Sequence, residues 1–359
     1  MKILINALSG IGDAIMFYPA LNLLKKHLPD AEIDMLAMFS QVRDIFSASP
    51  MINKIFHIDF LHQSKFRSLQ EVWALREHKY DYSINVYPSN RWEYNILDRM
   101  IGAKKRIAVK YLNYSGKNLD IFNSLLINEV KGRHNVLQNF DLAKIIAPGM
   151  IENELGPLEI TSNDDDRNWA EKYINENNLN GKFIIGFHAG SQTFKGHINK
   201  RWATEKYTEL AKVLAGEFDA KIILFGTEQD VNSAIHEAAG GITLIPETKT
   251  ITQSISLIRH CRLFVSNDTA LMHISAALQI PTAAIFGYTN SKELYPWQNK
   301  HIIVRHDLPC SPCFYNSPKS VNCIFKGNEE FKCIREITTE EVYSACKTLI
   351  KEIPGNIKT

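Results

Sequence analysis

The chain has 359 residues, about twice the length of an ordinary domain, so two domains are expected. Its 41 Lys and Arg residues nearly balance 39 Asp and Glu residues, and the formal charge of +2 argues against nucleic acid as a partner. The sequence opens on an apolar strand, without a signal-peptide pattern or an apolar run of about 20 residues, so we expect a cytoplasmic protein. Its six cysteines are not expected to form disulfides in that reducing compartment.

The first strand, residues 2–8, leads through a glycine-containing turn into a helix expected over residues 14–27. Pro19 lies inside that helix, so a kink or a shorter first segment is expected there. Asp13 closes the turn and brings a carboxylate to the carboxyl end of the first strand. It is a candidate general base, and N-capping of the helix is its ordinary alternative role.

The same turn departs from the dinucleotide-binding fingerprint. It contains Gly10 and Gly12, but Ile15 occupies the position of the third glycine. The next strand, residues 32–37, ends without the acidic residue that would bind a ribose. A nicotinamide or flavin cofactor is therefore disfavoured.

Strands and helices continue to alternate along the first half of the chain, which predicts a parallel sheet with helices on both faces. The expected strands cover residues 54–58, 81–86 and 106–109, and the expected helices lie near residues 41–48, 68–78 and 91–101. Asn90 and Arg91 belong to an aromatic and basic segment after one strand end, which suits sugars or phosphates. A basic patch at residues 104–110 is either a solvated face or a surface for anionic headgroups.

The composition becomes polar after residue 150, and we place the link between the domains at residues 156–166. Asp164 and Asp166 match the bare D-x-D pattern of metal-dependent sugar transferases. They also open a helix expected over residues 167–177, where acidic side chains favour the helix dipole, and this second reading is the stronger one.

The second half repeats the alternation of strands and helices. Its expected strands cover residues 183–188, 221–225 and 242–245, and its expected helices cover residues 204–217 and 251–260. Loops after these strands offer Ser191, Lys200, Arg201 and Glu228. Two cations and an acidic side chain that can accept from ribose hydroxyls predict a site for a nucleotide diphosphate.

Residues 263–287 read as a buried strand, a sharp turn, a short helix and a second strand. Asp268 and Thr269 supply N-cap residue types, and the small Ala270 lets a ligand approach the unpaired N–H groups of the helix. His273 lies one turn further along the same face. The alternative is a plain strand–helix unit in which Asp268 caps and His273 is a satisfied core histidine.

These motifs together resemble family 9 glycosyltransferases, the ADP-heptose heptosyltransferases of lipopolysaccharide core assembly. The resemblance runs over nearly the whole chain through G-x-GD-A near residue 13, H-A-G-S and K-R-W near residues 188–202, F-G-T-E near 226, and S-N-D-T-A-L-M-H near 270. It implies the α/β fold called GT-B, in which two Rossmann-like, doubly wound domains with parallel sheets face each other. The first binds the acceptor and the second binds the nucleotide sugar.

The resemblance also implies a domain plan. An acceptor domain would span residues 1–155, and a nucleotide-sugar domain would span residues 167–338 after the linker at 156–166. A cysteine-rich loop would occupy residues 309–336, and the helix in residues 339–359 would pack back on the first domain.

By the same resemblance, the reaction is an inverting transfer without a metal or other catalytic cofactor. Asp13 would be the base, and Gly12, Asn90 and Arg91 would contact the acceptor. The donor-binding residues would be Ser191, Lys200, Arg201, Glu228, Asp268, Thr269, Ala270 and His273. Among these, Asp268 is expected to support the site more than to bind the diphosphate, because two negative charges repel each other.

Four cysteines stand apart from this machinery. Cys310, Cys313, Cys323 and Cys333 form a C-x2-C-x9-C-x9-C set in a loop rich in Pro, Asn and Gly. Four thiolates at such spacings suit a structural zinc or iron ion, and four ordinary reduced thiols are the alternative.

The sequence thus predicts a heptosyltransferase that uses ADP-heptose and a lipopolysaccharide core or other glycan acceptor. A protein O-heptosyltransferase, a nucleotide-sugar epimerase of similar build and a non-catalytic nucleotide-sugar-binding module stay open as alternatives. Peripheral association with the inner face of the inner membrane is a further expectation.

Overall fold

A computed structural model describes residues 1–113, 116–316 and 319–353, and the chain folds into two compact units. The N-terminal domain comprises Met1–Thr161 together with Asn316, and the C-terminal domain comprises the remainder. The boundary falls within the polar segment 156–166. Residues 317–318 of the cysteine-rich loop and 354–359 of the C-terminal segment lie outside the described residues.

Six parallel strands form the N-terminal sheet in the order β3-β2-β1-β4-β5-β6. Its strands are β1 (Lys2–Ala7), β2 (Glu32–Ala37), β3 (Lys54–His57), β4 (Tyr82–Asn85), β5 (Lys105–Lys110) and β6 (Leu125–Asn128). The central strand β1 consists of Ile, Leu and Ile between polar ends, and these side chains are fully buried because helices cover both faces of the sheet.

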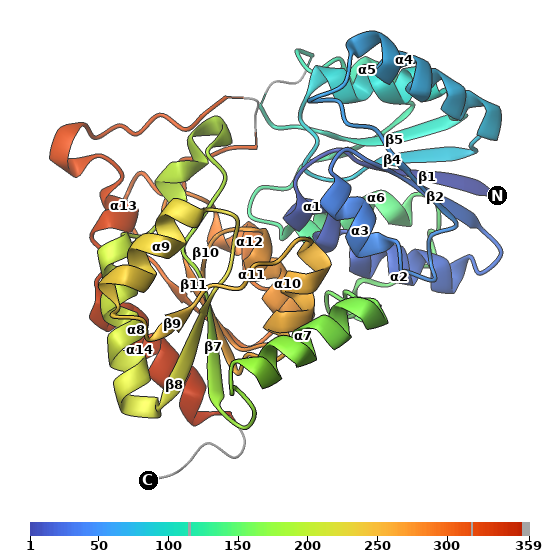
Figure 1. Ribbon diagram of the computed structural model, residues 1–359. Coiled ribbons are helices and arrows are strands. Elements are labelled where there is room, and N and C mark those ends of the chain that lie inside the picture. The colour runs from blue at the N-terminus through green and yellow to red at the C-terminus, as the bar shows by residue number, and fades with distance from the viewer. Residues whose placement is uncertain (114–115, 317–318, 354–359) are drawn as a thin grey trace. The chain divides into compact units, whose positions relative to one another are not determined.

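The helices of this domain pack on both faces, with α4 and α5 on one face and α1, α2 and α6 on the other (Figure 1). They are α1 (Ile11–Met16), α2 (Tyr18–His27), α3 (Ser40–Phe46), α4 (Lys65–Ala74), α5 (Trp92–Ile101) and α6 (Asn135–Lys144). The break expected from Pro19 is present, because α1 ends at Met16 and Pro19 lies in the first turn of α2. The first helix starts three residues earlier than expected, so Asp13 lies inside it.

The C-terminal sheet also has six parallel strands, in the order β12-β11-β10-β7-β8-β9. Its strands are β7 (Phe183–His188), β8 (Ala220–Leu224), β9 (Thr243–Leu244), β10 (Leu263–Asn267), β11 (Thr282–Ile285) and β12 (His301–Val304). Counted from β7, this is the 3-2-1-4-5-6 order of the first sheet. The expected α/β architecture with two doubly wound domains is therefore confirmed.

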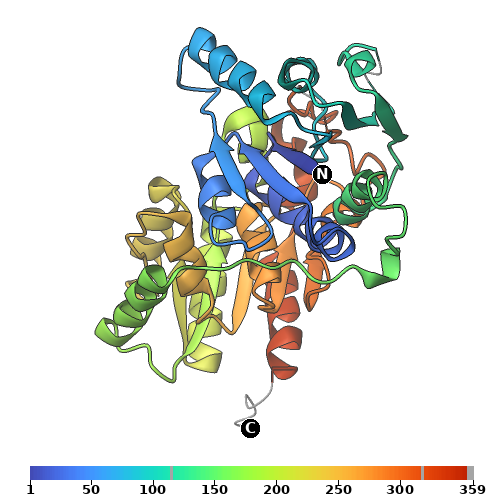
Figure 2. The ribbon, with the colours of Figure 1, turned by 90° about the vertical axis from the view of Figure 1, so that its right-hand side faces the viewer.

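Helices cover both faces of this sheet as well, with α8 and α14 on one face and α10 and α11 on the other (Figure 1). The helices are α7 (Asp164–Glu176), α8 (Thr204–Phe218), α9 (Gln229–Ala238), α10 (Ile251–Ile258), α11 (Ala270–Ala277), α12 (Ser291–Leu294), α13 (Lys332–Arg335) and α14 (Thr339–Lys351). Figure 2 shows, in green, the extended connection that leads into α7. Asn163 caps α7, and Asp164 lies in its first turn, so the helix-opening reading of D-x-D describes the structure.

The C-terminal helix α14 packs on the second sheet and on α8 of its own domain. Val342, Cys346 and Leu349 form its buried face and join the core of the C-terminal domain. The indole of the buried Trp202 donates to the carbonyl oxygen of Ile337 at 2.8 Å, just before the helix begins. Its apolar stripe is thus used within its own domain.

Each sheet has a topological switch point between its two central strands, β1 and β4 in one domain and β7 and β10 in the other. Ligands of doubly wound folds bind beyond the carboxyl ends of the strands at this point. The segments after these four strands contain Asp13, Asn90, Ser191 and Thr269 in turn. Topology alone therefore directs attention to the residues that the sequence motifs single out.

Candidate functional site

Asp13 is the third residue of α1 at the N-terminal switch point. Its Oδ2 atom accepts a hydrogen bond from the backbone N–H of Gly10 at 3.0 Å. A Cβ at Gly10 would lie 3.3 Å from the same oxygen, so the absence of a side chain there leaves room for the contact. Asp13 is half-buried, and its carboxylate can accept further hydrogen bonds beside this one, so the capping contact and a role as base are compatible.

The expected acceptor-binding residues differ in how many contacts they make within the protein. The amide of the buried Asn90 donates to the backbone oxygen of Asn316 at 2.9 Å and accepts from Asn118 at 3.3 Å. Arg91 pairs with Glu93 at 2.9 Å. Gly12 is half-buried beside Asp13 in the first turn of α1. Asn90 thus shapes its loop.

A buried polar cluster beneath this edge was not foreseen from the sequence. The Asn6 amide donates to Asn85 at 3.0 Å and to Asp98 at 3.1 Å, which links β1 to β4 at the switch point. Burial raises the pKa of the Asp98 carboxyl to about 6. The available signal was an Asn near the end of each central strand, where an apolar residue is usual.

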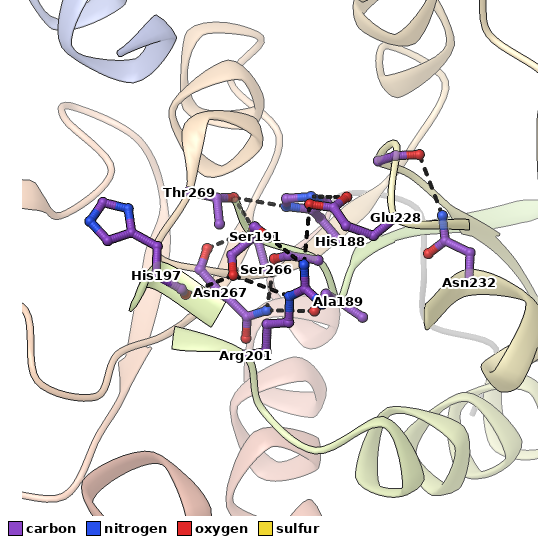
Figure 3. A network of polar contacts seen from close by, with 12 residues as sticks. His188, Ala189, Ser191, His197, Arg201, Glu228, Asn232, Ser266, Asn267 and Thr269 are labelled. Carbon is purple, nitrogen blue, oxygen red and sulfur yellow. Dashed lines mark hydrogen bonds and ion pairs between the residues drawn. The ribbon is translucent and has the colours of Figure 1, made fainter. Parts of the chain in front are cut away.

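In the C-terminal domain, Ser191 and Arg201 build the loop that carries the basic segment. The Ser191 hydroxyl donates to the carbonyl oxygen of His197 at 2.8 Å and accepts from Nε of Arg201 at 3.3 Å. A terminal nitrogen of Arg201 also donates to the carbonyl oxygen of Ser191. These bonds fold the segment back over the carboxyl end of β7, as Figure 3 shows.

Lys200 and Asp268 form a nearly buried ion pair, with Nζ 2.8 Å from Oδ2. Burial alone would raise the pKa of the Asp268 carboxyl, but the charge and hydrogen bond of Lys200 lower it below its ordinary value. Because Lys200 neutralises the Asp268 carboxylate, the repulsion expected between this carboxylate and a bound diphosphate is reduced. Asp268 holds the ammonium group at the carboxyl end of β10.

His273 is buried one turn into α11. Burial lowers the pKa of its imidazole to about 4, although the Asp268 charge acts in the opposite direction. Its Nδ1 atom has no hydrogen-bond partner among the described residues. The Nδ1 atom of this ring is therefore available to a ligand group.

Glu228 begins the segment that enters α9 after β8. Its Oε2 lies 3.7 Å from Nε2 of His188, and its Oε1 lies 3.9 Å from a terminal nitrogen of Arg201. Burial raises the pKa of Glu228, but its contact with His188, a backbone hydrogen bond and the charge of Arg201 together outweigh that effect, and the net pKa is lowered. A Cβ at Gly190 would lie 2.3 Å from a Glu228 oxygen, so the carboxylate occupies the space that this glycine leaves.

Thr269 is the N-cap residue of α11, and Ala270 is its first helical residue. The Thr269 hydroxyl does not cap the helix. It lies 2.8 Å from Nδ1 of His188 and 3.2 Å from the hydroxyl of Ser266 (Figure 3). The first N–H groups of α11 are therefore left without a side-chain cap, which suits an anion.

Asn267 and His188 are structural partners that the sequence analysis did not single out. The buried Asn267 amide donates to the backbone oxygens of Ala189 and Gly190 at 2.9 and 3.2 Å, and it accepts from the backbone N–H of Trp202 at 3.1 Å. It thereby holds the β7 loop and the start of α8 against β10. An Asn at the last position of a buried strand was the available signal.

The four loop cysteines do not fit a metal site as they are placed. Among the described residues, no group of three or more His, Cys, Asp or Glu side chains is arranged to hold an ion. Burial, and then the charges of the other three loop cysteines, raise the pKa of the Cys333 thiol to about 11. Cys313 is exposed, whereas Cys323 and Cys333 are buried. The expected zinc or iron therefore finds no support in this arrangement.

Within the described ranges, no helix is both long and apolar enough to cross a membrane.

Comparison with known proteins covers the chain almost completely. Residues 69–323 match the model of glycosyltransferase family 9 (heptosyltransferase). The chain is 26% identical over 365 aligned residues to lipooligosaccharide heptosyltransferase 2 of Campylobacter jejuni, covering 98% of this chain and 99% of that protein.

Solved structures show the same fold. Escherichia coli ADP-heptose lipopolysaccharide heptosyltransferase II is 22% identical, covers 98% of this chain and 99% of its own, and superposes with a TM-score of 0.72. An E. coli heptosyltransferase solved with ADP-2-deoxy-2-fluoro heptose is 16% identical, covers 98% and 99%, and gives a TM-score of 0.65. These similarities agree with the two doubly wound sheets described above, and with the expected GT-B class.

Proposed function

The chain belongs to glycosyltransferase family 9, the heptosyltransferase family, and from this premise we propose that it transfers a heptose from ADP-heptose to a lipopolysaccharide core acceptor with inversion. The protein is an enzyme of the glycosyltransferase class. The observation that carries the proposal is the C-terminal switch point, where the cation Lys200, the carboxylate Glu228 and the uncapped start of α11 occur together. A nucleoside diphosphate needs these three groups.

We assign the donor contacts by chemistry. The diphosphate lies against the first N–H groups of α11 at Thr269 and Ala270, with Lys200 as counter-charge and the neutral His273 as a hydrogen-bond partner. The ribose hydroxyls donate to Glu228. The ligand of the related E. coli structure, ADP-2-deoxy-2-fluoro heptose, supports a sugar carried on ADP.

The transfer step needs a base that takes the proton of the acceptor hydroxyl. The acceptor hydroxyl attacks the anomeric carbon from the face opposite the diphosphate, its oxygen forms the new glycosidic bond, and its proton passes to the Asp13 carboxylate. The bond to the diphosphate breaks, and ADP leaves with the electron pair. Lys200 and the helix N-terminus stabilise the charge that develops on the leaving group. In this proposal the step uses no metal.

A single assay tests the proposal. The purified chain is incubated with ADP-heptose and a heptose-deficient lipopolysaccharide core, and the products are identified by mass spectrometry. The expected result is an acceptor heavier by one heptose, together with an equal amount of ADP. Modification of a protein in place of the glycan would identify a protein O-heptosyltransferase. Isomerised sugar without an acceptor would identify an epimerase, and donor binding without any product would identify a binding module.

The proposed acceptor is amphiphilic, and α4 of the N-terminal domain offers a face that suits a membrane surface. Its buried side presents Ser68 and Val72. Its outer side carries a second apolar stripe of Phe66, Leu69 and Trp73, which are 72%, 44% and 59% exposed. Helical side chains three and seven residues apart lie on one face, so these three form a continuous stripe.

Cations border this stripe. Lys65 and Arg67 lie at its start, and the guanidinium of Arg76 lies 4.6 Å from the Trp73 ring. Aromatic side chains beside Lys and Arg are typical of helices that lie in a lipid interface. We therefore propose that α4 docks on anionic lipid. Some of these cations already have partners: Arg67 of α4 pairs with Glu71 at 2.9 Å, and in the basic patch at 104–110 Lys104 pairs with Asp81 and Arg106 donates to the backbone oxygen of Phe122.

Co-sedimentation with vesicles tests this contact. The protein should sediment with phosphatidylglycerol vesicles and remain in solution with phosphatidylcholine vesicles. The double variant Phe66→Ser/Trp73→Ser should lose sedimentation, whereas Ile121→Ser, at a residue of similar exposure in the same domain, should keep it. Equal sedimentation of both variants would reject α4 as the docking face.

A further inference from the structure

We propose that His188 is a positioning residue that connects the ribose carboxylate Glu228 to the Thr269 hydroxyl at the start of α11. Through this ring, the ribose and diphosphate ends of the donor are recognised together. The inference rests on the proposed function, because it presumes that the C-terminal domain binds a nucleoside diphosphate sugar.

The ring of His188 is placed for this connection. It ends β7, is 5% exposed and lies between the two groups (Figure 3). Its Nδ1 atom is 2.8 Å from Oγ1 of Thr269, and its Nε2 atom is 3.7 Å from Oε2 of Glu228. A carboxylate oxygen beside Nε2 favours a proton on that nitrogen. In the neutral ring, Nδ1 then accepts from the Thr269 hydroxyl.

At the helix, this contact withdraws the threonine hydroxyl from capping. Two other helices of the same domain begin at a threonine that caps them. Thr250 accepts from the backbone N–H of Gln253 at 3.1 Å, and Thr338 accepts from that of Glu341 at 3.2 Å. Thr269 makes no such bond, because its hydroxyl is turned to His188. The ring therefore keeps the first N–H groups of α11 available to a diphosphate.

At the ribose end, the His188 ring and the Glu228 carboxylate pack beside Gly226. A Cβ at Gly226 would lie 2.7 Å from Oε2 of Glu228 and 2.8 Å from the His188 ring, and Gly226 has a φ of +113°. The imidazole and Glu228 therefore fill this space together. With one oxygen oriented by His188 and the other near Arg201, the carboxylate presents its remaining lone pairs in one direction.

Two conservative variants separate the two ends of the connection. The amide oxygen of His188→Asn reaches about as far as Nδ1 and can still accept from Thr269, whereas the amide nitrogen of His188→Gln reaches about as far as Nε2 and can still donate to Glu228. The dissociation constants of ADP, 2′,3′-dideoxy-ADP and adenosine are measured by calorimetry for each protein. The ADP/dideoxy-ADP ratio reports the ribose contact, and the ADP/adenosine ratio reports the diphosphate contact.

We expect His188→Asn to lower the preference for ADP over dideoxy-ADP by about five- to tenfold while keeping the preference over adenosine, since one hydrogen bond is worth about 1 kcal/mol. His188→Gln should show the reverse, because the released Thr269 hydroxyl caps α11 and competes with the diphosphate. A purely structural role for His188 would lower the unfolding temperature without separating the two ratios.

Several outcomes decide the matter. A wild-type protein that binds no ADP would refute the proposed function. A wild-type protein that discriminates all three ligands, with both variants keeping both ratios, would refute only the role of His188. If the His188 variants do not fold, Thr269→Val provides the test, because it removes the hydroxyl that orients the ring. It should then lower the preference for ADP over dideoxy-ADP, and an unchanged ratio would overturn the inference.

Discussion

The two domains share one strand order, yet the N-terminal ends of the helices at their switch points, α1 and α11, differ in how they are capped. In the N-terminal domain, the first turn of α1 is closed by its own side chain, because Asp13 accepts from the N–H of Gly10. In the C-terminal domain, the cap residue of α11 turns away from its helix toward His188. One helix start therefore carries a negative charge, and the other is left open to receive one.

This difference shows how one fold can serve two halves of a reaction. A carboxylate at a helix start accepts a proton from a hydroxyl, whereas open N–H groups beside a lysine bind a phosphate. The division also differs below the surface. Buried amides and the raised pKa of Asp98 support the N-terminal switch point, while an ion pair supports the C-terminal one.

Removal of the Asp13 charge tests the N-terminal half of this comparison with the largest expected effect. Asp13→Asn should reduce the transfer rate by about 10²- to 10⁴-fold, the usual contribution of a positioned base, and leave ADP affinity within a few-fold. Single-turnover kinetics and calorimetry measure the two quantities. Asp30→Asn, at an exposed residue of the same domain, is the control. Full activity of the Asp13 variant would remove it as the base.

Loss of the lysine tests the C-terminal half. Lys200→Ala should weaken ADP binding by about 10- to 100-fold and adenosine binding much less, because charge-assisted bonds to phosphate contribute about 1.5–3 kcal/mol. Part of the loss comes from Asp268, which is left without its buried partner. Lys212→Ala on the exposed side of α8 should change neither affinity. If both ligands lose affinity equally, Lys200 does not contact the diphosphate.

A methyl group at Gly226 tests whether the ribose end is as tightly built as described. Gly226→Ala places a Cβ 2.7 Å from a Glu228 oxygen at a φ of +113°, so the carboxylate must move. We expect ADP affinity to fall by about tenfold, with little change for inorganic pyrophosphate. The same substitution at Gly240, which has open space, is the matched control. Unchanged ADP binding would mean that Glu228 has no part in it.

The fully buried carboxyl of Asp98 predicts that the stability of the protein depends on pH. The pKa of Asp98, about 6, lies above the ordinary value of about 3.9, so the folded protein binds the extra proton between these values. Its contribution to the free energy of unfolding therefore falls as pH rises from about 4 to about 6, and stays low above that range.

Asp98→Asn should remove this dependence and make the variant more stable than the wild type at pH 7 by on the order of 1 kcal/mol, with no gain at pH 4. Urea unfolding at several pH values measures the difference. Asp81→Asn is the control of opposite sign, because the hydrogen bond from Lys104 lowers the pKa of that carboxyl. A gain that is the same at all pH values would mean that Asp98 does not titrate in this window.

The cysteine loop gives the smallest effect. Elemental analysis of untagged protein should detect no stoichiometric zinc or iron if the thiols are placed as described, and alkylation should modify the exposed Cys313 before the buried Cys333. About one metal per chain, with all four thiols protected, would instead support the structural ion that the cysteine spacing predicts.

The sequence predicted those elements whose burial is apolar. Residues 183–187 form a continuous apolar run before His188, residues 32–37 are apolar apart from Glu32 and Asp34, and both strands have the expected bounds. The helix α6 was missed although Val136, Phe140 and Ala143 recur at helical spacing, because the polar Asn135, Gln138 and Asn139 are buried beside them and interrupt the apolar pattern. The strand β6 was missed because its short sequence alternates between half-buried and exposed residues at the sheet edge.

In the candidate site, the sequence could single out only residues that directly follow a strand end. Lys200, Glu228 and Thr269 follow strand ends, and topology gathers the ends of parallel strands at one edge. His188 could not be assigned a role in this way, because its contacts are with Glu228 and Thr269, which follow the strands β8 and β10. Contacts between loops depend on side-chain rotamers, which periodicity does not encode.

The placement of Asn316 has a consequence for modular engineering. This residue comes from the cysteine-rich loop, yet it belongs to the N-terminal domain, where its backbone oxygen accepts from Asn90 and its amide donates to the Tyr87 hydroxyl at 3.2 Å. A protease cut near residue 161 would therefore not yield an N-terminal fragment with all its own bonds. Chimeras that exchange the first 161 residues to graft a new acceptor preference should transplant the stretch around Asn316 as well. Otherwise the grafted loop after β4 loses the partner that holds it.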